Sequence, residues 1–304
     1  MLRHYDDLQI GSLELFCLTV EKKSFSAAAI AAGISPAAVS RAISRLEAKF
    51  GVKLFVRTTR QLKITDAGQH YYYFCKQALN SLLEGEMQIS GEQEHPIGLL
   101  KISVPTAYAH YRLLPKMAKF AELFPHIKLE IHVSNHNVNL VTDDYDIAIR
   151  GNELTDSGLI ARKLEDAALC IVATPEYLKR HPAPINIEDL QHHECILFEL
   201  PSSGKSGPWS LMDAGKKIMV DVQGKITCKD DYLSTLILAK SGAGLMQVYR
   251  FSVEQELQSG ALVEVLKSYS QTTRPFYLLY PKSNYQSSKL KAFINFMLNA
   301  SAQS

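Results

Sequence analysis

The chain of 304 residues is long enough for about two domains, and its 46 % of hydrophobic residues can form cores without disulfides or metals. With 21 % charged residues and no run of about 18 apolar residues, the composition excludes a disordered chain and a membrane-spanning protein. The charge is unevenly divided, because residues 1–90 carry a net +3 and residues 91–304 a net −1. The basic part is therefore expected to meet a polyanion, while the larger part has a different task.

The N-terminus and the cysteines indicate a cytoplasmic chain. MLRHYDDLQIG has acids where a signal peptide has its apolar core, so we expect no secretion. No CxxC or Cys/His spacing suits a structural zinc, and we expect no metal and no cofactor. The plain interpretation is that all five cysteines are free reduced thiols, although a redox pair of Cys195 with Cys170 or Cys228 is an open alternative. The other two are Cys17 and Cys75.

Three helices are predicted near the N-terminus. Apolar spacing predicts a helix over residues 8–21, and Ser24 is a suitable N-cap for a second helix over 25–32. Gly33 can adopt the left-handed conformation that ends this helix. Ser35 as N-cap and Pro36 as first helical residue then predict a third helix.

The third helix has two different faces. Its inward stripe is formed by apolar residues, namely Ile34, Val39, Ala42, Ile43 and Leu46. Its outward side has small and hydroxyl residues near the start and arginines one turn later, namely Pro36, Ala37, Ser40, Arg41, Ser44 and Arg45. Such a face can enter the DNA major groove. The alternative is an ordinary amphipathic helix pair with a solvated basic face.

Positive charge is concentrated between residues 36 and 65, where seven Lys/Arg stand against one acid, a net +6. The alternating pattern KLFVRTTRQLKIT over 53–65 predicts two short strands joined at 58–60, a wing beside the helices. Arg57 and Arg60 lie at its tip, from where they can reach phosphates or the minor groove.

A long helix is predicted over residues 66–90. Its apolar stripe steps by three or four residues and comprises Ala67, Tyr71, Phe74, Ala78 and Leu82, with Cys75 and Leu79 beside it. A stripe of this period on a helix that extends beyond its own domain is typical of a dimerisation helix. The alternative is that the helix folds back on the small domain. Residues 91–98, GEQEHPIG, form a polar hinge.

The first 90 residues resemble the winged helix-turn-helix and linker helix of LysR-type transcriptional regulators. The resemblance is carried by FSAAAIAAGISPAAVSRAISRLEAKFGVKLFVRT, by TDAG at 65–68 and by the helix that follows. The family commonly has Gln where Pro36 or Ala37 stands, and this departure affects the expected base preference. The DNA-facing residues expected from the outward face and the resemblance are Ser35, Pro36, Ala37, Ser40, Arg41, Arg45, Arg57 and Arg60.

From residue 99 onward, short apolar runs alternate with helical patterns. This alternation predicts an α/β fold with parallel sheets, and about 200 residues suit two lobes. Strands are expected at 99–104, 127–133, 145–150, 159–164, 168–174, 195–199, 217–222, 225–229, 244–249, 262–266 and 275–280. Helices are expected at 107–124, 137–143, 231–241 and 286–300.

Polar groups follow several of these strands, where parallel sheets bind ligands. They lie in the segments 103–106, 134–135, 150–151, 200–209 and 229–231. Backbone amides, hydroxyls and the Arg150 guanidinium in such positions suit a small carboxylate-bearing ligand. The alternative for each position is that Ser and Asp merely cap helices.

This part resembles the periplasmic-binding-protein-like effector domain of the same family, with two Rossmann-like lobes joined by crossover strands at about 162–168 and 267–274. The segments that match include ISVPTAYAHYRLLP, YDIAIRGNELTDSGLIARKL, the PSSGK…PW loop and SGAGLMQV. The resemblance implies an effector cleft lined by Pro105, Thr106, Ser134, Arg150, Phe198, Ser202, Asp230 and Gln247. The expected division is 1–65 DNA-binding domain, 66–90 linker helix, 91–98 hinge and 99–304 regulatory domain, with lobe I at about 99–163 and 273–304 and lobe II at about 168–267.

Enzymatic function is not expected. The chain has no GxSxG, GxxxxGK[ST] or HExxH motif, and the neighbouring side chains of His192, His193, Glu194 and Cys195 point in different directions along a strand. A solute-binding protein would explain the lobes but not the basic segment. The resemblance therefore implies a ligand-responsive transcription factor that binds double-stranded DNA and a small effector, contacts RNA polymerase, and forms homodimers or homotetramers away from membranes.

Overall fold

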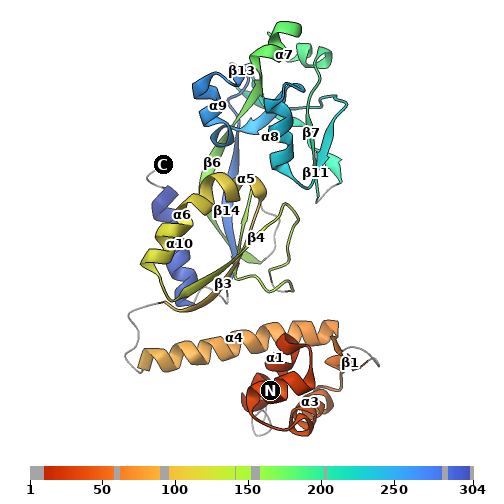
Figure 1. The fold of residues 1–304 in the computed structure, drawn as a ribbon, viewed down its shortest axis with the longest axis vertical. Coiled ribbons are helices and arrows are strands. Elements are labelled where there is room, and N and C mark those ends of the chain that lie inside the picture. Colours follow the sequence, from red (N-terminus) through yellow and green to blue (C-terminus); the bar gives the residue numbers. More distant parts are fainter. Residues whose placement is uncertain are drawn as a thin grey trace. The chain divides into compact units, whose positions relative to one another are not determined.

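A computed structural model describes residues 10–57, 62–89, 96–140, 142–151, 158–201, 204–282 and 287–301 (Figure 1). The chain divides into two compact units, of which the first is built chiefly from residues 1–95 and the second from residues 96 onward. Most of the predicted hinge at 91–98 lies outside the described residues.

The first unit is a helical domain with a small hairpin. Its elements are α1 (Ile10–Lys22), α2 (Phe25–Ala32), α3 (Pro36–Phe50), β1 (Phe55–Arg57), β2 (Leu62–Ile64) and α4 (Asp66–Ile89). The predicted turn is confirmed: Ser24 Oγ accepts from Ala27 N at the start of α2, and Gly33 ends this helix with φ +67°. The chain bends by 109° between α2 and α3, which is typical of a helix-turn-helix.

The core of the first unit gathers side chains from all its helices and from the hairpin. Phe16 of α1 is fully buried against Phe55 of β1, and Ala29 is buried at the crossing of α2 with α3. The inward stripe of α3 is confirmed for its last four members, which are at most 3 % exposed. The prediction was wrong for Ile34, which is 40 % exposed because it belongs to the turn and not to the helix.

The second unit contains a mixed sheet with the strand order β12 (Met246–Tyr249), β6 (Leu159–Ala173), β14 (Thr273–Pro281), β5 (Ile147–Arg150), β3 (Gly98–Val104) and β4 (Ile127–Val133). The strand β13 (Val263–Val265) also pairs with β6. Its lobe I part comprises β3 (Gly98–Val104), β4 (Ile127–Val133), β5 (Ile147–Arg150) and the long strands β6 (Leu159–Ala173) and β14 (Thr273–Pro281). β3 pairs in parallel with β4 and β5, whereas β14 runs antiparallel to both β5 and β6. The expectation of parallel sheets is therefore wrong for β6 and β14, because these strands cross between the lobes and return.

Two long helical segments cover this sheet. The first begins with α5 (Thr106–Tyr108), continues through a π-helical segment (Ala109–Leu113) and ends with α6 (Leu114–Leu123). The second is α10 (Ser288–Ser301), which lies beside α6 (Figure 1). The rings of Phe120 on α6 and Phe293 on α10 lie 5.5 Å apart in the core. The predicted helix over 107–124 is thus confirmed in position but contains the π-helical segment.

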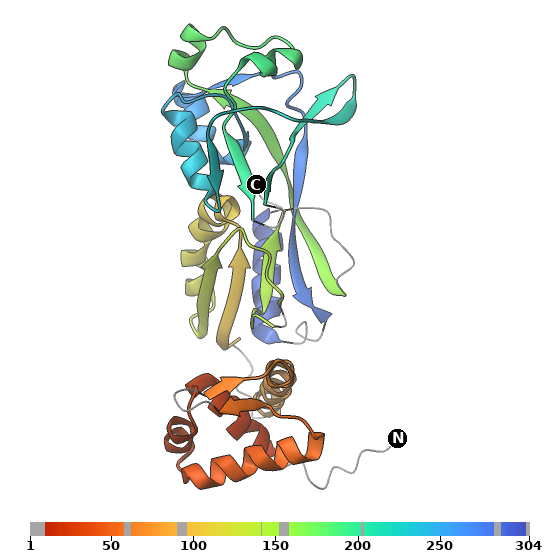
Figure 2. The ribbon, with the colours of Figure 1, turned by 90° about the vertical axis from the view of Figure 1, so that its right-hand side faces the viewer.

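Lobe II surrounds the C-terminal end of β6 and the N-terminal end of β14 (Figure 2). Its helices are α7 (Pro175–Arg180), α8 (Tyr232–Lys240) and α9 (Glu254–Ser259), with 3₁₀ turns at Glu188–His192 and Arg250–Ser252. Its strands are β7 (Leu197–Leu200), β8 (Lys205–Ser206), β9 (Trp209–Asp213), β10 (Lys216–Val220), β11 (Thr227–Lys229), β12 (Met246–Tyr249) and β13 (Val263–Val265). β8 lies within the segment 200–209, which was expected as a loop, and β9 was not among the predicted strands.

The helix predicted at 137–143 is absent from the described residues of that segment, which are irregular at 137–139 and form turns at 140 and 142–143. Asn139 N donates to the Asp143 carboxylate at 2.9 Å, and Asn139 Oδ1 accepts from Thr142 N at 3.3 Å. Side chains of this kind compete with helical backbone bonding, which explains the error.

Candidate nucleic-acid interface and ligand pocket

The outward face of α3 is built by its cap and its buried stripe. Ser35 Oγ accepts from Ala38 N at 3.3 Å, and Pro36 follows at the first helical position. Because the opposite side is held in the core, five side chains of the predicted DNA face are exposed and Ser40 is half-buried. The exposed ones are Ser35, Pro36, Ala37, Arg41 and Arg45. Arg41 and Arg45 are one turn apart and therefore share a face.

Glu47 ties α3 to the wing. Its Oε1 accepts from Leu54 N at 2.9 Å and from Phe55 N at 3.3 Å, and its Oε2 pairs with Lys53 Nζ at 2.7 Å. Burial alone would raise the pKa of Glu47, but the bonds from Lys53, Leu54 and Phe55 outweigh burial and hold this pKa below its usual value. The single acid of the basic segment thus fixes where the hairpin begins.

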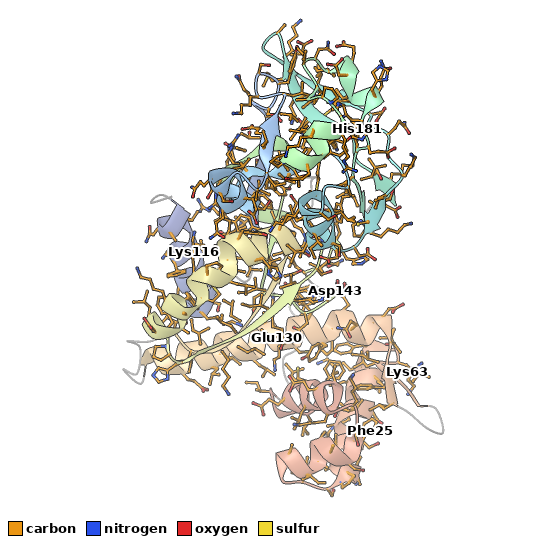
Figure 3. The ribbon with its side chains drawn as sticks, turned by 45° about the horizontal axis from the view of Figure 1, so that its top comes forward. Phe25, Lys63, Lys116, Glu130, Asp143 and His181 are labelled. Carbon is orange, nitrogen blue, oxygen red and sulfur yellow. The ribbon has the colours of Figure 1, made fainter. Side chains whose placement is uncertain are left out.

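The wing is an antiparallel pair in which Phe55 lies opposite Ile64. Lys63 on β2 has an exposed side chain in the first unit (Figure 3). Arg57 closes β1, but its side chain and the whole of Arg60 lie outside what the structure describes. Their predicted positions at the tip stay predictions.

Helix α4 has a buried face and an exposed apolar face. Tyr72 and Cys75 are buried in the core of the first unit, so the alternative that this helix packs on the small domain holds for one face. Phe74 is 52 % exposed and Leu82 48 % exposed, and Ala78 between them is also exposed. The predicted stripe is therefore only partly on the surface of the single chain, because Tyr71 packs against the core and Cys75 is buried in it.

In the second unit, Arg150 lies at the end of β5 beside the end of β3. Its Nη2 donates to Ser103 Oγ at 2.8 Å and to His136 O at 3.0 Å, and burial lowers its pKa to about 10, so it is charged at neutral pH. Arg150 has no carboxylate partner among the described side chains. It can stabilise the loop after β4 as well as a negative charge.

Asn135 links the two lobes. Its Oδ1 accepts from Thr106 N at 3.1 Å, and its Nδ2 donates to Thr106 Oγ1 at 3.0 Å and to Asp230 O at 2.7 Å. Asp230 precedes α8 and has a left-handed φ of +62°. Ser134 Oγ accepts from His136 N at 3.2 Å, so Ser134 forms a turn and does not cap a helix.

A pocket of about 80 Å³ lies in lobe II and at the crossover strands. Most of its lining residues are hydrophobic or aromatic, and they come from β6, β7, β9, β12, β14, the start of α8 and the segments before β7 and β9. The lining residues are Leu169, Ile196, Phe198, Leu200, Gly207, Pro208, Trp209, Tyr232, Met246, Gln247, Tyr249 and Arg274. Hydrophobic and aromatic side chains with a small number of polar groups are the usual lining of a small-molecule site.

Two family models match the chain: "LysR substrate binding domain" over residues 93–302 and "Bacterial regulatory helix-turn-helix protein, lysR family" over residues 10–69. The chain belongs to the LysR family. The regulator CrgA of Neisseria meningitidis serogroup B is 34 % identical over 94 % of this chain and 95 % of its own. The solved structure of CrgA matches at 33 % identity with a TM-score of 0.61, covering 97 % of this chain and 99 % of CrgA. The full-length virulence activator AphB of Vibrio cholerae is 28 % identical with a TM-score of 0.60, over 96 % and 99 % of the two chains.

These findings confirm the predicted fold class and function. This LysR-type chain has an N-terminal helix-turn-helix domain and a C-terminal α/β effector-binding domain, and it is a ligand-responsive, DNA-binding transcriptional regulator. The relatives that it matches are named transcriptional regulators.

Only part of the predicted effector set lines the pocket of this LysR-type domain. Phe198 and Gln247 line the pocket. Thr106 and Asp230 instead form hydrogen bonds with Asn135, and Arg150 donates to Ser103. Pro105 precedes α5 as its N-cap residue without a side-chain bond, and Ser202 lies outside the described residues. Sequence reasoning missed Trp209, Tyr232, Tyr249 and Arg274, although Trp209 closes the PSSGK…PW segment.

The histidine-rich segment of lobe II does not gather into one site. His193 Nδ1 lies 3.1 Å from Tyr177 Oη, Glu194 pairs with Lys225 at 2.9 Å, and Cys195 is buried. The described part of the chain contains no group of three or more His, Cys, Asp or Glu that could hold a metal ion. Burial raises the pKa of the Cys170 and Cys195 thiols to about 12, which makes them unreactive at neutral pH.

No single helix among the described residues is long and apolar enough to cross a membrane. Helices α2 and α3 are long and apolar enough for a membrane span only when they are counted together, and the chain bends by 109° between them.

Proposed function

We propose that α3 reads the DNA major groove through Ser35, Pro36, Ala37, Ser40, Arg41 and Arg45. The observation that carries this proposal is the division of α3, whose apolar stripe is buried while its small residues and arginines are exposed. Small residues at the start of the helix allow the backbone to approach base edges, and arginines one turn later can bond to guanine or phosphate. Arg57, Arg60 and Lys63 on the wing then contact the DNA backbone or minor groove.

The test is binding of the full-length protein to a duplex selected in vitro by the same protein. We expect Arg41→Ala to weaken binding by a factor of about 10 to 100 and to relax base preference at one position, because a bidentate base contact contributes about 1–3 kcal/mol. Arg162→Ala is the matched control, since Arg162 is an exposed arginine on β6 outside the first unit. Equal affinities of Arg41→Ala and Arg162→Ala at moderate salt would contradict the proposal.

We infer that the regulator acts as a homodimer through α4 and as a tetramer through further contacts of the effector domain. Two recognition helices on one duplex raise affinity and suit a palindromic operator. The exposed stripe with Phe74, Ala78 and Leu82 supports a partner helix on α4. The proposed division of labour is 1–65 for DNA binding, 66–90 for dimerisation, 91–98 as hinge and 99–304 for the effector.

We propose that the effector binds in the second unit and changes the arrangement of the oligomer on DNA. The effector must bind the two arrangements with different affinity, because otherwise it cannot shift their populations. The change alters DNA bending and the contact with RNA polymerase. A protein with this task works in the cytoplasm and needs no catalysis. Thermal unfolding of the full chain with small carboxylates tests for an effector, because a ligand that binds the native state raises the unfolding temperature.

A further inference from the structure

Four aromatic side chains from different elements surround the pocket in lobe II. They are Phe198 of β7, Trp209 of β9, Tyr232 of α8 and Tyr249 of β12. The rings of Phe198 and Tyr232 lie 5.9 Å apart and nearly perpendicular, and those of Tyr232 and Tyr249 also lie 5.9 Å apart. Such walls favour a flat ring, which can form edge-to-face and stacked contacts with them.

Most polar groups of this pocket already have partners. Gln247 Oε1 accepts from Ser210 N at 3.0 Å, and its Nε2 donates to Ser210 O at 2.8 Å. Tyr232 Oη accepts from Tyr249 N at 3.1 Å. These groups stabilise the pocket walls and leave little hydrogen-bonding capacity for a ligand with many hydroxyls, such as a sugar.

Arg274 differs from the other lining residues because it brings a charge. Its guanidinium carbon lies 5.9 Å from the centre of the Tyr249 ring, and its Nη1 lies 3.5 Å from Tyr249 Oη, which is a weak contact. None of the described carboxylates forms an ion pair with it. A half-buried guanidinium beside an apolar pocket can bind a carboxylate with two parallel hydrogen bonds.

The size of the pocket limits the ligand. Its volume of about 80 Å³ is smaller than the roughly 150 Å³ of an engineered apolar cavity that binds benzene. A fused ring system or a nucleotide is therefore too large, and a single ring is the upper limit of what the pocket can take.

We propose that this pocket is the effector site of the regulator and that its ligand is a monocarboxylate with a single aromatic ring. The ring lies among Phe198, Trp209, Tyr232 and Tyr249, and the carboxylate bonds to Arg274. The class of ligand follows from the lining residues themselves. The statement that this ligand acts as an effector rests on the proposed function.

The chain offers a direct probe of this pocket, since Trp209 is its single tryptophan. Tryptophan fluorescence of the full-length protein is titrated with benzoate, which has both the ring and the charge. Benzyl alcohol has the ring without the charge, acetate has the charge without the ring, and cyclohexanecarboxylate replaces the flat ring by a saturated one. We expect a saturable change with benzoate and at least about tenfold weaker binding of the other three, since one charge-assisted contact or one well-placed ring supports a factor of this order.

The Arg274→Gln variant separates the charge from the shape of the site. We expect it to weaken benzoate binding about 10- to 100-fold and to leave benzyl alcohol binding unchanged. Arg162→Gln is the control, because Arg162 is exposed on β6 and does not line the pocket. Unfolding temperatures of both variants show that they fold. Benzoate affinity that is equal in the wild type and in Arg274→Gln, or equal to that of cyclohexanecarboxylate, would overturn the proposal.

The same titration distinguishes this proposal from the proposed function. If benzoate occupies the pocket as expected but leaves affinity and footprint on the selected duplex unchanged, the ligand class stands and the effector role fails. If Trp209 fluorescence does not respond to benzoate while the duplex binds as expected, DNA binding stands and the ligand class is wrong.

Discussion

The Asn135 side chain donates to the backbone carbonyl of Asp230 at 2.7 Å and thereby connects the loop after β4 with the start of α8. The same amide holds Thr106 N and Thr106 Oγ1 at the start of α5. One side chain thus stabilises a helix start in lobe I and a contact with lobe II. These hydrogen bonds restrain the movement of one lobe against the other. A ligand that rearranges the lobes must either break or strengthen them.

Replacing Asn135 with Ala should loosen this connection. Thr106 N loses its acceptor, and an unpaired partly buried donor costs about 1–3 kcal/mol of unfolding free energy. His136→Ala is the neighbouring control, because its 3.4 Å pair with the Asp230 carboxylate joins side chains that are more than 60 % exposed and contributes less than about 1 kcal/mol. Chemical denaturation of the full chain measures both changes. A loss for His136→Ala as large as that for Asn135→Ala would contradict the assigned role.

The sequence predicted those parts of the molecule whose structure depends on neighbouring residues. Ser24, Gly33 and Ser35 determine where α2 and α3 begin and end, and local caps of this kind are visible in the sequence. The buried stripe of α3 follows from its periodicity. The turns at 137–143 were missed because the side chains of Asn139 and Asp143 bond to the backbone and replace helical bonds.

The pocket was harder to predict, because its walls come from strands far apart in the sequence. Periodicity shows that β12 and β14 alternate between two faces, but not that Tyr249 of β12 and Arg274 of β14 meet at one cavity. The rule that ligands bind at the ends of parallel strands led to Thr106, Ser134 and Arg150 instead. That rule does not apply to β6 and β14, which are antiparallel.

Gly68→Ala should destabilise the first unit strongly. A Cβ atom at Gly68 would lie 2.3 Å from Leu54 O and 2.7 Å from Ile64 Cγ1, so α4 and the wing would have to separate. We expect a loss of about 1–3 kcal/mol or more, as is usual for overpacking at a close backbone contact. Gly85 lies in the same helix with nothing within 4 Å of such a Cβ atom. Gly85→Ala should therefore increase stability by up to about 1 kcal/mol, and thermal unfolding that ranks the two variants in the reverse order would refute the argument.

Glu47→Gln should weaken the attachment of the wing and change its dependence on pH. The charged carboxylate accepts from Leu54 N and Phe55 N and pairs with Lys53, and such bonds to a charged group contribute about 1.5–3 kcal/mol. Because these bonds hold the pKa of Glu47 below its unfolded value, its contribution is complete above that unfolded value. The contribution is lost as the pH falls through the lower, folded pKa.

The measurement is the unfolding free energy of wild type and variant from neutral pH into the acid range. Their difference should be largest near neutral pH and should shrink on acidification. Glu122→Gln on the exposed side of α6 is the control and should give a small difference at neutral pH. A difference for Glu47→Gln that stays constant down to strongly acidic pH would mean that the lost carboxylate charge is not the cause.

Phe74→Glu should prevent dimerisation without unfolding the chain. Phe74 is 52 % exposed on α4, next to the exposed Ala78 and Leu82, whereas the buried face of the same helix is formed by Tyr72 and Cys75. A charge in an apolar helix pair is unfavourable because it must be desolvated without a partner. Light scattering after size exclusion should therefore show a shift toward monomer, with an unchanged unfolding temperature at low protein concentration. Ile185→Glu is the control at a residue that is 84 % exposed in lobe II and should leave the mass unchanged. If Phe74→Glu retains the oligomeric mass of the wild type, α4 does not form the interface and its apolar stripe has another role.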